Sequence, residues 1–547
     1  MQIVILYKMT SPIITKVNIL NYKKFRNFSI DLNPELSIIV GDNESGKTTL
    51  LEAISICLKL QINNHSIATE VTPYIFNDKS VSEYIEKIKK GFSAEPPYIE
   101  IEVFFKDGSV DSVLKGENNS LKSNVPGIKT IIRLDVEKYG DEYRSYVDEI
   151  KKQGTNIKCV PSEYYTIERK SFAGNNIRYF DNPVKLFTIA NMENRFQNGV
   201  DRFITDILDD TLELTDRATM SFQYRSLKDK FFKNDAIKKL NEKIKEEDVS
   251  DKKIEISMDV SSKTNLDSSL TLYVDDIPLR YSGKGEQVSI KTKLALKSKA
   301  NGSNLIMIEE PEVNQSFSSM NKLVSAITDI CSSKQIIITT HSSYITNKCN
   351  IKNAIAINGD SVKSFFSLDK ETFDYFEKLP NYDTLRSILS KKLILVEGPS
   401  DELVVQKAYS EYHKNRLPLQ DGIDVLAVNS LAFKRFLEII RNLDKEVCVI
   451  TDNDGNLNSG RINKLNKYTN EKIKIYYPQN EVTNTLEPCF VECNDLGVLN
   501  SVFKKQFTTK NELVEYMIKN KTEWALSVFE TKERLIFPEY IVNAVKE

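Results

Sequence analysis

The sequence predicts an α/β protein with two α/β regions in series and a helical stretch inserted into the first. Three observations support this prediction. A glycine-containing loop near the N-terminus lies between an apolar strand pattern and a helix pattern. Residues 183–250 have helical spacing and are rich in Leu, Ile, Phe and Lys. From residue 391 a second strand–helix series begins, and acidic residues follow its apolar strands. Such alternation is typical of α/β folds.

Bulk composition sets the class of protein. A chain of 547 residues with 40% hydrophobic and 28% charged residues is expected to be globular and to hold two to four domains. The net charge of −2 gives no overall basic signature, so any nucleic acid must be bound through a local patch or metal ions. The seven cysteines lack paired spacing, which favours reduced thiols. With no leader pattern and no run of about 20 apolar residues, we expect a cytoplasmic protein without a membrane contact.

The first strand–loop–helix unit carries a phosphate-binding loop. Residues Gly41–Thr48 fit G-x-x-x-x-G-K-[ST], between a predicted strand over 36–40 and a predicted helix over 49–60. Glycines let backbone N–H groups turn toward phosphate oxygens, and the helix adds its positive end. Lys47 should reach the β- and γ-phosphates, and the Thr48 hydroxyl should bind Mg²⁺. The residues expected to hold ATP here are Gly41, Asn43, Gly46, Lys47, Thr48 and Thr49.

Two strand patterns, over 13–20 and 28–32, precede this loop. A pair of antiparallel strands leading into a phosphate loop resembles the start of ATP-binding cassette (ABC) ATPases of the structural-maintenance and RecF type. That resemblance places Lys23, Phe25 and Arg26 near the adenine. A plain exposed turn is the alternative.

Later motifs follow the order of the same family. Ser282, in Tyr281–Gln287, resembles the ABC signature loop. Glu309 and Glu310 end an apolar strand pattern, where the first carboxylate would serve Mg²⁺ and the second would polarise the attacking water. His341 ends a further apolar run and resembles the switch histidine that contacts the γ-phosphate. In the family each signature loop completes the ATP site of a second unit, which implies a homodimer or a higher homo-oligomer.

The predicted domains are therefore an N-terminal ATPase part over 1–182, a helical insertion over 183–250, a second ATPase part over 251–380 and an α/β domain over 381–547. The helical insertion is a candidate dimerisation element, and its charged faces are most simply solvated surface.

The C-terminal region places acids after its apolar strands. Glu397 and Asp401 follow the strand pattern over 391–396, and Asp452 and Asp454 follow the one over 447–451. Carboxyl ends of neighbouring parallel strands converge, and clustered carboxylates repel one another unless cations lie between them. Hard oxygen ligands suit Mg²⁺ or Mn²⁺. The Glu-Gly plus Asp-x-Asp pattern resembles the Toprim domain of topoisomerases, primases and some nucleases.

An ABC-type ATPase followed by Toprim resembles the overcoming-lysogenization-defect (OLD) family of ATP-dependent endonucleases, including anti-phage nucleases of the Gabija or retron-associated type. That resemblance implies that Glu487 helps to hold a second metal. It also implies that Lys521 steadies the developing charge on the phosphorane. Lys519 is the alternative lysine if the register slips. Glu397 is either a metal ligand or a general base, and the sequence leaves both roles open.

The implied function is an ATP-binding, metal-dependent DNA endonuclease in anti-phage defence, using two metals to hydrolyse a phosphodiester. An operon partner, either a helicase or a reverse transcriptase with its RNA–DNA product, is implied by family analogy alone. One alternative is an ATPase switch or scaffold whose Toprim region binds nucleic acid or a partner without cleavage. A topoisomerase- or primase-like enzyme is a further alternative, but the sequence shows no nucleophilic Tyr in a winged-helix context. Whether ATP licenses or inhibits cleavage stays open.

Overall fold

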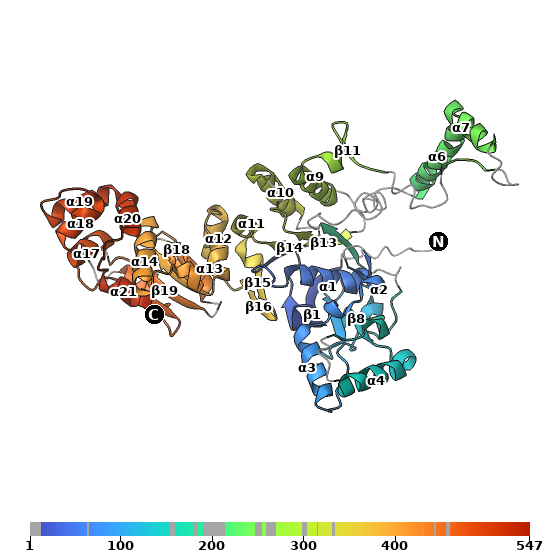
Figure 1. The fold of residues 1–547 in the computed structure, drawn as a ribbon, viewed down its shortest axis with the longest axis horizontal. Helices are drawn as coiled ribbons and strands as arrows, with labels where there is room; N and C mark the ends of the chain where they lie inside the picture. The colour runs from blue at the N-terminus through green and yellow to red at the C-terminus, as the bar shows by residue number, and fades with distance from the viewer. Residues whose placement is uncertain are drawn as a thin grey trace, which may run out of the picture. The chain divides into compact units, whose positions relative to one another are not determined.

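The computed structural model describes residues 12–62, 65–153, 159–178, 184–189, 214–246, 254–258, 270–297, 303–313, 316–330, 334–429, 432–441, 443, 445–453, 455 and 460–546 (Figure 1). The chain divides into two compact units. The first takes in the chain up to residue 340 except residues 40–43, and the second takes in residues 40–43 and 341–547. Each unit is described by itself. Within the described ranges, no helix is long and apolar enough to cross a membrane.

The first unit contains an antiparallel sheet with the order β2-β1-β6-β8-β7, and β9 pairs with β8. Its strands are β1 (Ile14–Tyr22), β2 (Phe25–Asp31), β6 (Ile99–Phe105), β7 (Lys115–Gly116), β8 (Val125–Leu134) and β9 (Tyr165–Ser171). In β2, Phe25, Phe28 and Ile30 are buried while most intervening residues are exposed, as expected for a strand with one covered face. Helix α1 (Lys47–Lys59) packs against β1, β6 and β8.

A second sheet in this unit runs in the order β10-β13-β14-β3. Its strands are β10 (Lys185–Ile189), β13 (Ser303–Glu309), β14 (Gln335–Thr340) and β3 (Leu36–Val40). β10 pairs parallel with β13, and β13 pairs parallel with β14. Apolar runs such as Leu305–Ile308 are buried throughout, which is typical of parallel strands covered on both faces. The motifs expected to bind nucleotide lie at the carboxyl ends of these strands.

The remaining described elements of the first unit are shorter strands and surface helices. They are β4 (Gln61–Ile62), β5 (His65–Ser66), α2 (Ile67–Glu70), α3 (Asp78–Lys89), α4 (Val136–Gln153), α6 (Leu214–Phe232), α7 (Asp235–Glu246), β11 (Tyr273–Val274), β12 (Ile277–Pro278), α9 (Lys284–Lys297) and α10 (Phe317–Ile330).

The predicted helical stretch over 183–250 is wrong at its start. Lys185–Ile189 form β10, a strand of the ATPase sheet, and Leu186 and Phe187 are buried there. A short apolar run has the same pattern in a buried strand and in a buried helix, so periodicity could not separate them. Helices α6 and α7 do lie further along the stretch (Figure 1). The dimerisation role of the insertion stays a prediction.

The second compact unit also takes in the segment from His341 to residue 380, and the predicted domain boundary at residue 381 stays a prediction. Helix α11 (Ser343–Lys348) holds the connection to the later domain, because the Asn347 amide donates to the carbonyl oxygens of Pro380 (3.0 Å) and Tyr382 (2.9 Å). Thr384 donates to the Asn347 side chain at 2.7 Å. The segment also contains β15 (Ala354–Asn358), β16 (Ser361–Ser364), α12 (Lys370–Lys378) and α13 (Thr384–Leu389).

A parallel sheet with the order β18-β17-β19-β20 forms the centre of the second unit. Its strands are β17 (Lys392–Val396), β18 (Ile423–Ala427), β19 (Glu446–Ile450) and β20 (Ile473–Tyr476). The chain adds β18 on one side of β17 and then β19 and β20 on the other. The direction of winding therefore reverses between β17 and β19, and ligands of open α/β sheets bind at the carboxyl ends of strands at such a switch point.

The described helices that follow β17 in this unit are α14 (Pro399–Tyr412), α15 (Phe433–Ile440), α16 (Gly460–Asn466), α17 (Leu486–Cys493), α18 (Leu496–Phe503), α19 (Lys510–Lys519), α20 (Lys521–Glu530) and α21 (Glu539–Lys546). Helix α14 packs against α20, α21 and β18 (Figure 1). The single tryptophan, Trp524, is fully buried in the resulting core beside Phe490.

Candidate nucleotide and metal sites

The phosphate-binding loop packs at Gly46 against the aromatic ring of Phe25. Gly46 has φ +111°, and a Cβ at this position would lie 2.6 Å from the Phe25 ring. Phe25 is fully buried and stacks on Phe28 at 3.9 Å between ring centroids. The expectation that Lys23, Phe25 and Arg26 lie near the adenine stays a prediction. Gly46 is required because neither its φ nor its space suits a side chain.

The Mg²⁺-binding groups predicted for the nucleotide meet in the structure. The Thr48 hydroxyl donates to Glu309 Oε1 at 2.5 Å, which joins the start of α1 to the end of β13. Lys47 is 6% exposed at the first position of α1. Glu310 follows with φ +43°, a backbone region that few side chains adopt and that is common at functional sites. Its N–H donates to the Thr339 carbonyl oxygen at 2.9 Å, which fixes Glu310 at the strand end.

The two other nucleotide-site predictions are placed at the ends of elements. Ser282 follows a short turn before α9, and the Gln287 amide donates to its carbonyl oxygen at 2.8 Å. His341 directly follows β14. Lys23 pairs with Glu52 at 2.5 Å, and Arg26 pairs with Glu83 at 2.7 Å. The roles of Ser282 and His341 toward the γ-phosphate stay predictions.

The acidic strand ends of the second unit also meet, at the switch point of its sheet. Glu397 directly follows β17, and Thr451 and Asp452 directly follow β19. One oxygen of Glu397, Oε1, accepts from the Asp452 N–H at 3.0 Å and from the Thr451 hydroxyl at 2.6 Å. The Glu397 carboxylate thus contacts the backbone of Asp452, the second predicted strand-end acid.

Arg461 is a member of this site that the sequence did not reveal. Its guanidinium donates to the same Glu397 Oε1 and to the Thr451 hydroxyl, the latter at 2.7 Å. The side chains of Arg461 and Glu397 are 25% and 19% exposed, so the ion pair is partly shielded from solvent. An arginine near the start of α16, 64 residues from its partner, has no sequence pattern that could have identified it.

Asp401 and Glu487 bring uncompensated charge to the same place. Asp401 Oδ2 accepts from the Gly398 N–H at 3.1 Å, at the start of α14. Burial, and then the carboxylates of Glu397 and Glu487, raise the pKa of Asp401 to about 7. Glu487 lies in the first turn of α17 and is only 5% exposed, and its side chain forms no hydrogen bond within the described part of the chain. Buried carboxylates left in this state are suited to a divalent cation, and oxygen donors favour Mg²⁺ or Mn²⁺.

Tyr540 and Asn453 connect this acidic site to its surroundings. Burial, and then the nearby Asp452, Cys489, Asp401 and Glu487, raise the pKa of the Tyr540 hydroxyl well above its ordinary value. Asn453, between the two acids of the Asp-x-Asp motif, is fully buried. Its amide donates to the carbonyl oxygens of Pro478 (2.6 Å) and Asn480 (2.9 Å), which ties the acidic loop to the loop after β20.

The roles of Asp454, Lys521 and Lys519 stay predictions. Asp454 lies outside the described residues. Lys521 is exposed at the first position of α20, and Lys519, also exposed, lies 4.0 Å from Glu515. Within the described ranges, no three His, Cys, Asp or Glu side chains are close enough together to hold one metal ion. The donor type therefore fits a divalent cation, while the ligand set stays a prediction.

These features define an α/β ATPase with a phosphate-binding loop, joined to a smaller parallel α/β domain with acids at its switch point. Residues 13–346 match the family described as AAA ATPase domain, and the chain belongs to that family. Residues 388–454 match the family described as overcoming lysogenization defect protein-like, TOPRIM domain. The predicted fold class, an ABC-type α/β ATPase followed by a Toprim domain, and the resemblance to OLD-type proteins are both confirmed.

Two curated relatives match different lengths of this chain. Endonuclease GajA of Bacillus cereus (strain VD045) is 22% identical over 472 residues, which cover 80% of this chain and 75% of that protein. The DNA replication and repair protein RecF of Clostridium beijerinckii is 36% identical over 44 residues, 8% of this chain and 12% of that protein.

Two solved structures are distantly similar to this chain. An Smc head bound to the C-winged helix domain of ScpA has 14% identity and a TM-score of 0.34, covering 64% of this chain and 97% of that chain. The recombination mediator RecF with ATP has 10% identity and a TM-score of 0.32, covering 66% and 99%. At these TM-scores the likeness carries no argument of its own.

Proposed function

We propose that this chain is a DNA endonuclease that depends on Mg²⁺ or Mn²⁺, is regulated by its ATPase domain, and acts in bacterial defence against phage. The observation that carries the proposal is the contact of Glu397 with the Asp452 backbone at the switch point of the Toprim-matched sheet, with Asp401 and Glu487 in electrostatic reach. Similarity to a protein named an endonuclease supports it. Clustered carboxylates that are partly or fully shielded from solvent would only destabilise a domain that had no cation to bind.

Each acid has a proposed task. Divalent cations held by these carboxylates supply Lewis acidity at a scissile phosphate and lower the pKa of a bound water. Glu397 Oε1 already accepts from three donors, although one carboxylate oxygen offers about two lone-pair sites. Oε2 is therefore the oxygen that faces a ligand, and this favours Glu397 as a metal ligand over Glu397 as a general base. Asp401, Asp452 and Glu487 supply further oxygens, and Asp454 and Lys521 join the proposal by family resemblance.

The ATPase part has a proposed regulatory role. Lys47 binds the β- and γ-phosphates, Thr48 and Glu309 hold the accompanying Mg²⁺, and Glu310 polarises the attacking water. The hydrogen bond between the Thr48 hydroxyl and Glu309 supports the shared Mg²⁺ role of these two residues. Ser282 and His341 would act on the γ-phosphate, Ser282 from a second copy of the chain. A homodimer or higher homo-oligomer is therefore part of the proposal.

The test is a plasmid nicking assay with the purified full chain, Mg²⁺ or Mn²⁺, and reactions with and without ATP. We expect the wild type to nick or cleave, and we expect Asp452→Asn to lose this activity. Glu533→Gln, which changes an exposed acid of the same unit, is the matched control and should stay active. Lys47→Ala should lose ATP binding and alter the nucleotide dependence of cleavage. Absence of cleavage by the wild type under every condition, or full activity of Asp452→Asn, contradicts the proposal.

A second candidate function is an ATPase switch whose Toprim domain binds nucleic acid or a partner without cutting. One observation favours it, namely that within the described ranges no three potential ligands are close enough to share an ion. Calorimetric titration with Mn²⁺ separates the two functions. Binding heat that disappears in Asp452→Asn supports the nuclease, and absence of binding heat in the wild type supports the switch.

A further inference from the structure

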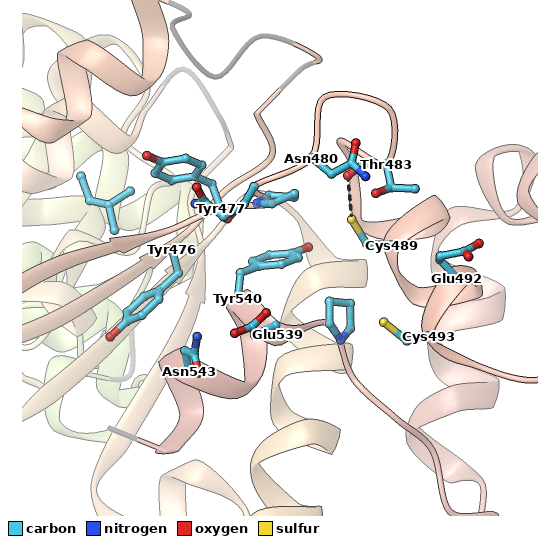
Figure 2. Close-up of a pocket in the computed structure, with 14 residues that line it drawn as sticks. Tyr476, Tyr477, Asn480, Thr483, Cys489, Glu492, Cys493, Glu539, Tyr540 and Asn543 are labelled. Carbon is cyan, nitrogen blue, oxygen red and sulfur yellow. Dashed lines mark hydrogen bonds between the residues drawn. The ribbon is translucent and has the colours of Figure 1, made fainter.

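A pocket of about 450 Å³ lies at the carboxyl end of β20. It is lined by the loop that follows this strand, by α17 and by the start of α21 (Figure 2). β20 pairs parallel with β19, so the pocket lies at the same edge of the sheet as Asp452. Pockets that hold small molecules have volumes of roughly 300–1,000 Å³, and this one is large enough for a nucleobase.

The lining combines aromatic rings, amides and carboxylates. Tyr476, Tyr477 and Tyr540 line it, and Figure 2 shows the Tyr540 ring in the middle of the labelled side chains. The Asn480 and Asn543 side chains are also part of the lining, and each offers both a donor and an acceptor.

Glu492 and Glu539 also line the pocket, and Glu492 pairs with Lys510 at 3.5 Å. The Glu539 carboxylate repels a phosphate group. The chemistry therefore selects a neutral, planar group with hydrogen-bonding edges, which describes a nucleobase rather than the sugar–phosphate backbone.

Two contacts connect the pocket to the acidic site. Asn453 holds the carbonyl oxygens of Pro478 and Asn480, and thereby fixes the pocket loop to the strand end that carries Asp452. Tyr540 lines the pocket and lies in electrostatic reach of Asp452 and Asp401. The Tyr540 side chain is 8% exposed, and its hydroxyl forms no hydrogen bond to any residue that the structure describes.

We propose that this pocket receives an unpaired nucleobase of the strand whose phosphodiester lies at the acidic site. The inference rests on the proposed nuclease function and adds a substrate preference to it. A base inside a duplex has its faces stacked and its pairing edge occupied, so only a base that is single-stranded or flipped out can enter. The enzyme would then prefer to cut beside unpaired nucleotides.

The test uses the full chain and DNA oligonucleotides that carry the fluorescent base 2-aminopurine, either in a single strand or in a matched duplex. Ca²⁺ replaces Mg²⁺ so that binding is measured without cleavage. Stacking on tyrosine should quench the fluorescence of the single strand on binding and leave that of the duplex nearly unchanged. Cleavage by the same wild-type protein is measured separately in Mg²⁺, so a failure of the nuclease proposal and a failure of the base pocket give different results.

Two variants test the pocket, one by removing a hydrogen-bonding amide and the other by removing an aromatic ring. Asn543→Ala changes an exposed side chain and so leaves the core intact, and Tyr477→Leu removes a ring from the wall. Loss of one stacked base weakens single-strand binding about 5- to 100-fold in Tyr477→Leu. Tyr412→Leu is the matched control, because Tyr412 is an exposed tyrosine outside the pocket lining. The inference is overturned if the wild type shows no quenching, if it quenches the duplex equally, or if both pocket variants bind like the control.

Discussion

Replacing Arg461 with methionine tests the acidic site most directly, because it removes the cation that faces Glu397. Two unit charges about 4 Å apart attract by about 4 kcal/mol at an effective dielectric constant of 20. Both side chains are partly exposed, at 25% and 19%, and the pair must be desolvated to form. The net loss in free energy of unfolding is therefore expected to be about 1–2 kcal/mol, in the range of one charge-assisted hydrogen bond.

The chain contains its own probe for this measurement. Trp524 is the single tryptophan and is fully buried in the second unit, so its fluorescence follows unfolding of that unit alone. For a unit of this size, 1 kcal/mol corresponds to about 2–4 °C in Tm, and we expect Arg461→Met to lower the Tm by about 2–8 °C. Arg416→Met is the matched control, because Arg416 pairs with Asp421 at 2.6 Å and is 55% exposed.

Added Mn²⁺ should raise the Tm of Arg461→Met more than that of the wild type. A bound cation compensates the Glu397 charge that the variant leaves unpaired, and ligand binding to the folded state stabilises it in proportion to its affinity. If the Tm of Arg461→Met equals that of the wild type, the ion pair contributes nothing. If the Mn²⁺-induced shifts of the two proteins are equal, Glu397 is not a metal ligand.

Two further predictions concern the phosphate loop and a buried lysine. Gly46→Ala should abolish ATP binding and destabilise the first unit by about 2–3 kcal/mol, because Gly46 has φ +111° and the new Cβ meets the Phe25 ring. Chemical denaturation followed by circular dichroism measures the free energy of unfolding. Gly174→Ala is the control and should lower that free energy less, because Gly174 has φ +89° but lies in open space. Lys445 donates to the carbonyl oxygens of Ser387, Ile388 and Ser390, and burial lowers its pKa to about 8. Between pH 8 and the unfolded pKa of about 10.4 the unfolded chain binds more protons, so Lys445 makes the free energy of unfolding rise with pH, by at most about 3 kcal/mol. Lys445→Met should flatten that rise in Trp524 fluorescence, and an unchanged slope would contradict the assignment.

The sequence predicted the strand ends of both sites because those signals are local. An apolar run that stops at an acid locates Glu309, Glu397 and Asp452 without any knowledge of the tertiary structure. The strand over 36–40 was predicted with its observed bounds for the same reason. Convergence of Glu397 and Asp452 then followed from the parallel order of neighbouring strands.

The other site residues depend on contacts that are distant along the chain. Arg461 and Tyr540 reach the acids from helices whose local patterns resemble those of any surface or core helix. Asn453 looked like a spacer between two acids, yet its buried amide bonds with a loop more than 20 residues away. β10 was predicted as helix because five apolar-rich residues do not distinguish the two structures.

The position of Asn453 has a thermodynamic consequence. Since one side chain fastens the loop that bears Asp452 to the wall of the pocket after β20, neither loop can shift without straining the other. Occupancy of the pocket and cation affinity at the acids must then influence each other by equal amounts, because coupling between two binding equilibria is reciprocal. In the proposed nuclease, Asn453 therefore links the binding of a substrate base to the affinity of the acidic site for its cation.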